Sequence, residues 1–216
     1  MKGVIFDMDG TMVDNMMVHH RAWQQVLAEH GLPLELEVVK EKIHGINEEI
    51  LERLFGDKYT PEERKEISWK KESMYREIFL KDLKLINGCL DFIQKMDAKG
   101  VPMVVASAAP PENVDFVLDN LDLRKYFTAT FHSKSVSHGK PHPEIFLKAC
   151  ASLGFEPNEC VVFEDSPTGA KASANAGCNT VIITTTHEPK EFEGITGIVD
   201  FIKDFEQLKL EELQLH

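Results

Sequence analysis

The amino-acid sequence predicts an α/β fold in which a doubly wound parallel sheet forms the core and an all-helical segment is inserted near the N-terminus. From about residue 89 onward, short and wholly apolar stretches alternate with amphipathic ones, which is typical of parallel strands covered by helices on both faces. Another apolar stretch, residues 3–6, precedes a long region with helical periodicity and no strand pattern. We therefore expect residues 1–14 and 83–216 to form the core and residues 15–82 to form the insertion.

The first elements follow from this pattern. Residues 3–6 are expected to form a buried strand that ends at Asp7. The insertion should open with a helix over residues 16–30, because apolar side chains recur there at helical spacing until Gly31. Three more helices are predicted over residues 35–43, 47–55 and 61–79, the last of them opened by Thr-Pro-Glu-Glu, a strong helix start.

The core pattern resumes after Asn87 and Gly88. Apolar segments predict strands, and amphipathic segments between them predict helices that cover the sheet. Loops at the carboxyl ends of parallel strands are where such folds bind ligands. The predicted helices are 89–99, 112–121, 143–153 and 168–176, and the apolar segments are 102–107, 127–131, 160–163 and 180–184.

The composition excludes several classes of function. The 216 residues include 24 Lys and Arg against 36 Asp and Glu, and the net charge of −12 disfavours binding to nucleic acid through its phosphates. We find no signal peptide and no run near the ~18 apolar residues of a membrane span. The four cysteines lack the CxxC spacing of metal or redox sites. We expect a cytoplasmic monomer that contacts neither nucleic acid nor membrane.

Polar side chains gather where the predicted strands end. Because the carboxyl ends of parallel strands meet at one edge of a sheet, we expect these side chains to converge. Several carboxylates cannot share a site unless a cation neutralises them, and Mg²⁺ suits a site with few carboxylates and a substrate phosphate. The converging residues are Asp7, Asp9, Ser107, Lys140, Glu164 and Asp165.

These residue types suit phosphoryl transfer. A carboxylate such as Asp7 can attack phosphorus and form an aspartyl phosphate. Lys140, Ser107 and the backbone N–H of Ala108 can bind the negative charge of the transferring group. Asp9 can protonate the leaving oxygen and then deprotonate the water that releases phosphate. The sequence thus predicts a Mg²⁺-dependent enzyme that acts on a small phosphorylated metabolite.

The motifs DMDGT, VVASAA, GKPHP and FEDSPTGAKAS together resemble those of the haloacid dehalogenase-like superfamily. The helical insertion resembles the cap of its first subfamily, and the stretch ending HHRAW is similar to the β-phosphoglucomutase-like branch. The resemblance implies a Rossmann-like core with an all-helical cap domain. It also implies that Asp7 is the nucleophile and Asp9 the acid/base, and that both bind Mg²⁺ with Asp165, supported by Glu164.

The same resemblance implies three substrate-binding residues in the cap. His19 matches a cap histidine that contacts the acid/base aspartate, Lys71 matches a cap lysine that faces the site, and Gly45 fits a substrate-specificity loop. The residues alone leave alternatives open. His19 could be a surface helix residue, and Lys71 stands between Lys70 and Glu72 in a charged run typical of a solvated face.

Departures from the β-phosphoglucomutase-like branch bear on the substrate. The mutase has an arginine in the cap loop that grips a second phosphate, whereas Glu48 and Glu49 occur here. It also has polar residues after the serine, whereas Ala109, Pro110 and Pro111 occur here. A mutase must hold the distal phosphate of a bisphosphate firmly. We therefore predict a phosphatase of a small phosphomonoester, in particular a sugar phosphate, with β-phosphoglucomutase as the alternative.

Other functions are less consistent with the sequence. A dehalogenase attacks carbon and needs no acid at the position of Asp9. A phosphonate hydrolase needs a Schiff-base lysine in the cap, and Lys71 lies in a charged stretch that does not favour a neutral amine. A non-enzymatic phospho-acceptor receiver module also gathers Asp, Ser and Lys around Mg²⁺. It remains an alternative from another class, although its single domain of about 120 residues lacks a long helical insertion.

Overall fold

The computed structural model describes residues 2–43 and 46–209. The chain divides into two compact units. The core unit comprises Met1–Asp14 and Lys84–His216, and the helical unit comprises Asn15–Leu83. Within the described ranges, no helix combines the length and the apolar character that crossing a membrane would require.

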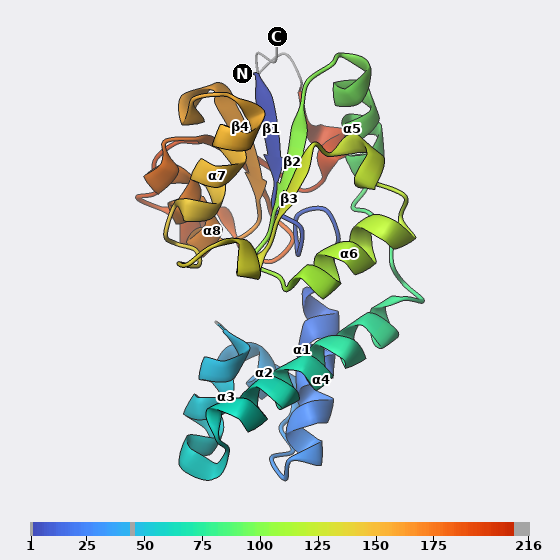
Figure 1. Cartoon of the computed structure of the whole chain (residues 1–216), viewed down its shortest axis with the longest axis vertical. Coiled ribbons are helices and arrows are strands. Elements are labelled where there is room, and N and C mark those ends of the chain that lie inside the picture. Colours follow the sequence, from blue (N-terminus) through green and yellow to red (C-terminus); the bar gives the residue numbers. More distant parts are fainter. Residues whose placement is uncertain (1, 44–45, 210–216) are drawn as a thin grey trace. The chain divides into compact units, whose positions relative to one another are not determined.

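The core unit is built on a six-stranded sheet with the order β3-β2-β1-β4-β5-β6, and every pair is parallel (Figure 1). The order reverses at β1, which lies between β2 and β4. In a doubly wound sheet, ligands bind outside the carboxyl ends of the strands at this reversal. The predicted α/β fold class is confirmed. The strands are β1 (Gly3–Phe6), β2 (Met103–Ala106), β3 (Ala129–Phe131), β4 (Cys160–Glu164), β5 (Asn179–Ile183) and β6 (Ile198–Ile202).

Helices cover both faces of this sheet (Figure 1). On one face, α7 (Glu144–Leu153) and α8 (Pro167–Ala176) pack on a cluster that includes Ile5, Val104 and Val162. On the other, α5 (Cys89–Ala98) joins Phe92 to an aromatic cluster with Phe6, Phe163 and Phe205. The central strands are apolar, apart from Glu164 at the end of β4, because both of their faces are buried. The remaining core helix is α6 (Pro111–Asn120).

Strand β6 was not among the predicted strands. Its residues are mostly half-buried or exposed, so it lacks the wholly apolar run that marks the central strands. Short 3-10 turns also escape the periodicity of the sequence. They are Gly56–Lys58, Arg124–Tyr126, Ser133–Ser135, Pro157–Glu159, Pro189–Phe192 and Phe205–Gln207.

The helical unit contains α1 (Met16–Glu29), α2 (Leu36–Lys42), α3 (Asn47–Phe55) and α4 (Pro61–Phe79), close to the predicted bounds. Helix α4 begins with a capping box, in which the Thr60 hydroxyl accepts from the Glu63 N–H and the Glu63 carboxylate accepts from the Thr60 N–H. Apolar side chains from these helices form a separate small core. Its buried members include Trp23, Val26, Leu27, Val39, Ile50, Leu51 and Ile67.

Candidate active site

Asp7 lies at the carboxyl end of β1, where the strand order reverses. Phe6 pairs with Val105 of β2 and with Phe163 of β4. The Asp7 N–H continues the ladder by donating to the carbonyl oxygen of Phe163 at 2.9 Å, which places Asp7 beside Glu164. The Asp7 side chain is buried, although an isolated carboxylate in such a position would be costly.

Lys140 supplies the positive charge that this position needs. Its Nζ lies 2.6 Å from Asp7 Oδ1 and 2.7 Å from Glu164 Oε1, and its side chain is only 7% exposed. Nζ also lies 4.8 Å from the ring centre of Phe146. The structure thus brings together two strand ends and a loop that is 133 positions away from Asp7 in the chain.

The loop that carries Lys140 is fastened to the start of α7. Both carboxylate oxygens of Glu144 accept backbone N–H groups, from Ser137 at 3.0 Å and from His138 at 3.0 Å. Lys148, one helical turn further on, donates to the same carboxylate at 2.8 Å. These bonds fix the backbone on either side of Lys140, so its ammonium group is held in position.

Glu164 has little freedom to rotate. Its Oε2 accepts the N–H of Asp165 at 2.8 Å and the N–H of Ser166 at 2.9 Å, while Oε1 accepts from Lys140. Gly169, in the first turn of α8, makes room for this carboxylate, because a Cβ there would stand 1.6 Å from Glu164 Oε1. Both oxygens of Glu164 therefore already have protein partners.

Asp165 points into the turn that follows β1. A Cβ on Gly10 would lie 2.1 Å from Asp165 Oδ2, and Gly10 also has a φ of +76°, so only glycine fits there. The Thr186 hydroxyl donates to Asp165 Oδ2, and the Thr185 hydroxyl donates to the Gly10 carbonyl oxygen. These two threonines follow β5 and were not predicted as site residues. Their signal in the sequence is the Thr-Thr-Thr run at the end of an apolar strand.

The electrostatics of this group favour an additional cation. Burial raises the pKa of Asp7 to about 7 against the opposing attraction of Lys140, and the charge of Glu164 raises it further. Burial, followed by the charges of Glu164 and Asp7, also raises the pKa of Asp165. Burial alone would lower the pKa of Lys140, but Asp7 and Glu164 together raise it. One ammonium group therefore does not compensate all the carboxylates.

The donor atoms fit a hard divalent cation. One oxygen from each of Asp7, Glu164 and Asp165 lies within 4.8 Å of the other two. Carboxylate oxygens are the ligands that Mg²⁺ prefers, and the rest of its coordination shell is commonly water and substrate phosphate. An ion there would offset the charge that burial makes costly.

The other predicted core residues lie at neighbouring strand ends. Ser107 follows β2 and is buried; its Oγ accepts the Ala109 N–H at 3.0 Å, so its hydroxyl hydrogen can be donated elsewhere. Ala108 is exposed between them. Asp9 is half-buried in the turn after β1, and its charge contributes to raising the pKa of Asp7.

The helical unit brings His19 and Lys71 together. Lys71 Nζ lies 2.8 Å from His19 Nδ1 and 2.8 Å from Glu72 Oε1. The solvated face expected from the charged run is wrong for Lys71, which is 2% exposed, and for Glu72, which is 8% exposed. Lys70 is exposed as expected and pairs at the surface with Glu29 at 2.7 Å, because each residue of a helix turns about 100° from the last and only the next two turn inward. Gly45 lies outside the described residues.

Further side chains complete this cluster, and they were not among the predicted site residues. The His19 ring stacks on Tyr75 with a centroid distance of 3.9 Å and an interplanar angle of 6°. The Tyr75 hydroxyl accepts from Asn15 at 2.6 Å. Asn47 donates to Glu72 Oε1 at 2.7 Å. The spacing of Lys71 and Tyr75 by four residues is the signal that could have placed them on one face of α4.

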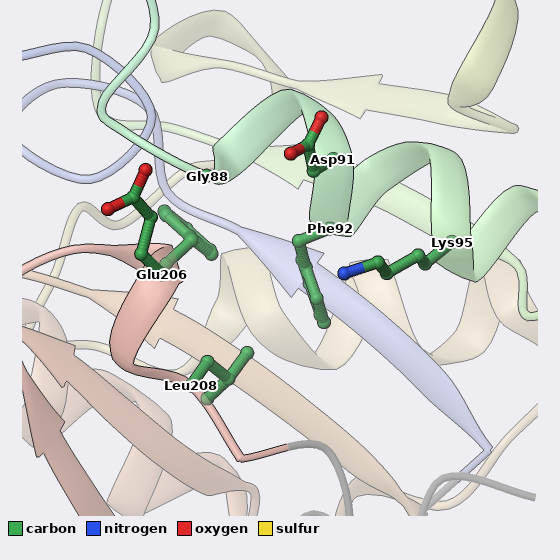
Figure 2. Close-up of a pocket in the computed structure, with 7 residues that line it drawn as sticks. Gly88, Asp91, Phe92, Lys95, Glu206 and Leu208 are labelled. Carbon is green, nitrogen blue, oxygen red and sulfur yellow. The ribbon is translucent and has the colours of Figure 1, made fainter.

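Two other features of the core unit lack this chemistry. A hollow of about 260 Å³ lies between α5 and the C-terminal 3-10 turn, and its lining includes Lys95, Glu206 and Leu208 (Figure 2) but no member of the Asp7 group. His138, His142 and Glu144 also lie close together, but both histidines are exposed and the carboxylate of Glu144 already accepts from Lys148 and two backbone N–H groups.

Comparison with known proteins agrees with this geometry. The family model described as haloacid dehalogenase-like hydrolase matches residues 1–177. A phosphorylated carbohydrates phosphatase from Thermotoga maritima is 31% identical over 182 residues, covering 82% of each chain. A β-phosphoglucomutase from Bacillus subtilis is 31% identical over 185 residues, covering 82% of this chain and 80% of the other.

A solved structure agrees over nearly the whole chain. It is a haloacid dehalogenase-type hydrolase of family IA, variant 3, from Entamoeba histolytica, with a TM-score of 0.90 at 26% identity, covering 99% of this chain and 97% of the other. The family match spans all the strand ends that carry the candidate residues, from Asp7 to Asp165. This chain belongs to the haloacid dehalogenase-like hydrolase family.

Proposed function

We propose that this enzyme is a Mg²⁺-dependent phosphatase that hydrolyses a small phosphomonoester, in particular a sugar phosphate, through an aspartyl phosphate on Asp7. The observation that carries the proposal is the buried contact of 2.6 Å between Asp7 and Lys140 at the reversal of the strand order. In this contact the proposed nucleophile lies beside a buried cation, which supports phosphoryl transfer. The phosphatase named among the relatives supports the same reaction class.

The proposed reaction has two steps. A carboxylate oxygen of Asp7 attacks phosphorus, the bond to the leaving oxygen breaks, and Asp9 gives that oxygen a proton. Asp9 then takes a proton from water, whose oxygen attacks the phosphorus of the aspartyl phosphate and frees inorganic phosphate and Asp7. Lys140 and the Ser107 hydroxyl bind the phosphoryl oxygens in both steps, with the backbone N–H of Ala108.

Mg²⁺ would be held by Asp7, Asp165 and the Asp9 carbonyl oxygen. Both Glu164 oxygens already accept protein hydrogen bonds, so we propose that Glu164 supports the ion through water and positions Lys140. When bound, Mg²⁺ would neutralise the clustered carboxylates and withdraw charge from the phosphoryl oxygens.

We assign the choice of leaving group to the helical unit, through His19, Lys71 and the segment around Gly45. The enzyme would act as a monomer on a small metabolite. The net charge of −12 supports a small substrate over nucleic acid. The four cysteines are free and buried, which supports a reducing compartment such as the cytoplasm.

A β-phosphoglucomutase is the second candidate, because a relative with that name matches most of the chain. The sequence around Glu48 and Glu49 disfavours it. These residues lie in the first turn of α3, where they add negative charge rather than the arginine that would grip a second phosphate. The family match to a hydrolase favours an enzyme over the receiver-like module.

Phosphate release from sugar phosphates, nucleotides and pyrophosphate, with and without Mg²⁺, tests the proposal. We expect Mg²⁺-dependent release from at least one phosphomonoester, abolished in Asp7→Asn. Asp115→Asn, which makes the same change at an exposed position, is the matched control and should retain activity. A coupled assay that converts β-glucose 1-phosphate to glucose 6-phosphate covers the mutase. Conversion without phosphate release would replace the proposal by the mutase, and no release that depends on Asp7 would reject it.

A further inference from the structure

We propose that Glu72 is a specificity-determining residue, which neutralises Lys71 so that the enzyme selects substrates with one phosphate and an uncharged, hydroxyl-bearing leaving group. This inference rests on the proposed function, in which Lys71 and His19 contact the leaving group. It adds a residue that the sequence patterns did not single out. It also predicts that the helical unit favours an uncharged leaving group over one that carries a second phosphate.

Lys71 is the one buried basic residue among the described residues of the helical unit. Its Nζ lies 2.8 Å from Glu72 Oε1, and the side chains are 3% and 11% exposed. A second phosphate that approached Lys71 Nζ would therefore also come close to the carboxylate of Glu72. Because the two charges cancel, such a phosphate would lose its hydration without gaining a net attraction.

Glu72 is held in this position from another helix. Asn47, the first residue of α3, donates to Glu72 Oε1 at 2.7 Å. Burial works to raise the pKa of Glu72, but Lys71 and His19 outweigh it and lower the pKa to about 2, so the carboxylate is charged at neutral pH. The following residues of α3, Glu48 and Glu49, add further negative charge.

His19 is the second partner of Lys71. Its Nδ1 lies 2.8 Å from Lys71 Nζ. The stacking on Tyr75 holds the ring in this orientation. Imidazole nitrogens can exchange hydrogen bonds with the hydroxyl and ether oxygens of a sugar. Because the Lys71–Glu72 pair beside the ring adds no net charge, the pair and the ring offer hydrogen bonds rather than a concentrated positive charge.

Kinetics with mono- and bisphosphates test this inference. The probes are the panel monoester that is hydrolysed fastest, with fructose 1,6-bisphosphate and glucose 1,6-bisphosphate measured as substrates and as competitors. In the wild-type enzyme we expect the KM or inhibition constant of both bisphosphates to exceed the KM of the monoester by about tenfold or more, a difference of about 1.4 kcal/mol. Glu72→Gln should narrow this ratio at least about fivefold, through tighter bisphosphate binding and not through kcat.

Two matched variants identify the cause. Glu77→Gln removes a charge from an exposed position on the same helix and should leave the ratio unchanged. In Lys71→Met/Glu72→Gln the buried cation is absent, so the tighter bisphosphate binding of Glu72→Gln should be lost. Circular dichroism and thermal unfolding establish that each variant is folded.

Three outcomes would overturn the inference. The wild-type enzyme could bind bisphosphates as tightly as the monoester, Glu72→Gln could leave the ratio of the bisphosphate constant to the monoester KM unchanged, or the double variant could keep the tighter bisphosphate binding. Where Glu72→Gln does not fold, the ratio measured for the wild-type enzyme still tests the inference. Absence of any Asp7-dependent phosphate release would instead reject the proposed function, so the two failures are distinguishable.

Discussion

Replacing Lys140 by methionine removes the only protein cation in contact with Asp7 and Glu164 among the described residues. Methionine has similar length and keeps the apolar packing beside Phe146, so the change isolates the charge. Lys140 lies 2.6 Å from one carboxylate and 2.7 Å from the other, with all three side chains buried. The variant therefore leaves two buried carboxylates without their partner.

Breaking a buried ion pair from one side costs about 3–5 kcal/mol, because the remaining charge stays buried and uncompensated. We expect Lys140→Met to lower the free energy of unfolding of the Mg²⁺-free protein by this amount. An exposed pair is worth about 0–1 kcal/mol, so Lys134→Met, which breaks a contact of 3.2 Å with Glu112 at the surface, should change stability little.

Urea denaturation in EDTA, followed by far-ultraviolet circular dichroism, measures these differences. Adding Asp7→Asn to Lys140→Met should recover about 1–2 kcal/mol, because it removes one of the two unpaired charges. In the presence of Mg²⁺, Lys140→Met should lower kcat for phosphate release about 10²- to 10³-fold, as expected for loss of one group that binds the transition-state charge.

A Lys140→Met protein that loses less than about 1 kcal/mol in EDTA would contradict a stabilising buried ion pair, since that value is typical of a surface pair. Further destabilisation of the Lys140→Met background by Asp7→Asn, in place of restored stability, would contradict it equally. Loss of activity without loss of stability would show that the lysine contacts only substrate and not the two carboxylates.

Three other predictions follow from the same contacts. Asp9→Asn should lower kcat about 10²- to 10⁴-fold for sugar phosphates and much less for p-nitrophenyl phosphate, whose leaving group departs without a proton. Mg²⁺ at about 100 times its Kd should raise the free energy of unfolding by about 2.7 kcal/mol, measured by thermal shift, and Asp165→Asn should abolish the increase. The pKa of Glu72 is lowered from 4.5 to about 2, so its stabilisation is complete above pH 4.5 and disappears as the pH falls toward 2. The stability difference between wild type and Glu72→Gln should therefore shrink by up to about 3 kcal/mol between pH 7 and pH 2, measured by the fluorescence of Trp23 and Trp69, both in the helical unit.

The core of the site was predictable because its signals are local. Each of Asp7, Ser107 and Glu164 follows an apolar strand, and the rule that parallel strands end at one edge brings them together without further information. The turn motif around Lys140 is likewise a local signal that can be recognised from the sequence alone. Thr185 and Thr186 were missed because a threonine after a strand is unremarkable until the register places it against Gly10 and Asp165.

The helical unit was predictable in its helices but not in its polar contacts. The run of Lys70, Lys71 and Glu72 has no sign of burial in its own composition, since only the packing of α4 on α1 decides which of its residues face inward. The stacking of His19 on Tyr75 joins residues from two helices, and no periodicity encodes it. Strand β6 was missed for a related reason, because an edge strand is covered on one face only and lacks a wholly apolar run.

We expect the distribution of charge within each unit to determine which part of the substrate that unit can attract. The chain as a whole repels anions, with a net charge of −12, so a phosphate must be attracted locally. Among the described residues of the helical unit, the one buried ammonium group, that of Lys71, is cancelled by Glu72, so little net attraction remains there. In the core unit Lys140 and a divalent ion would together balance the three carboxylates of Asp7, Glu164 and Asp165, and the ion would keep coordination positions open for the phosphate. A substrate with one phosphate would therefore bind in a single orientation, with its phosphoryl group toward Asp7. The described residues of the helical unit offer a second phosphate no buried cation without a carboxylate beside it, which is why we expect release of phosphate rather than its return to the sugar.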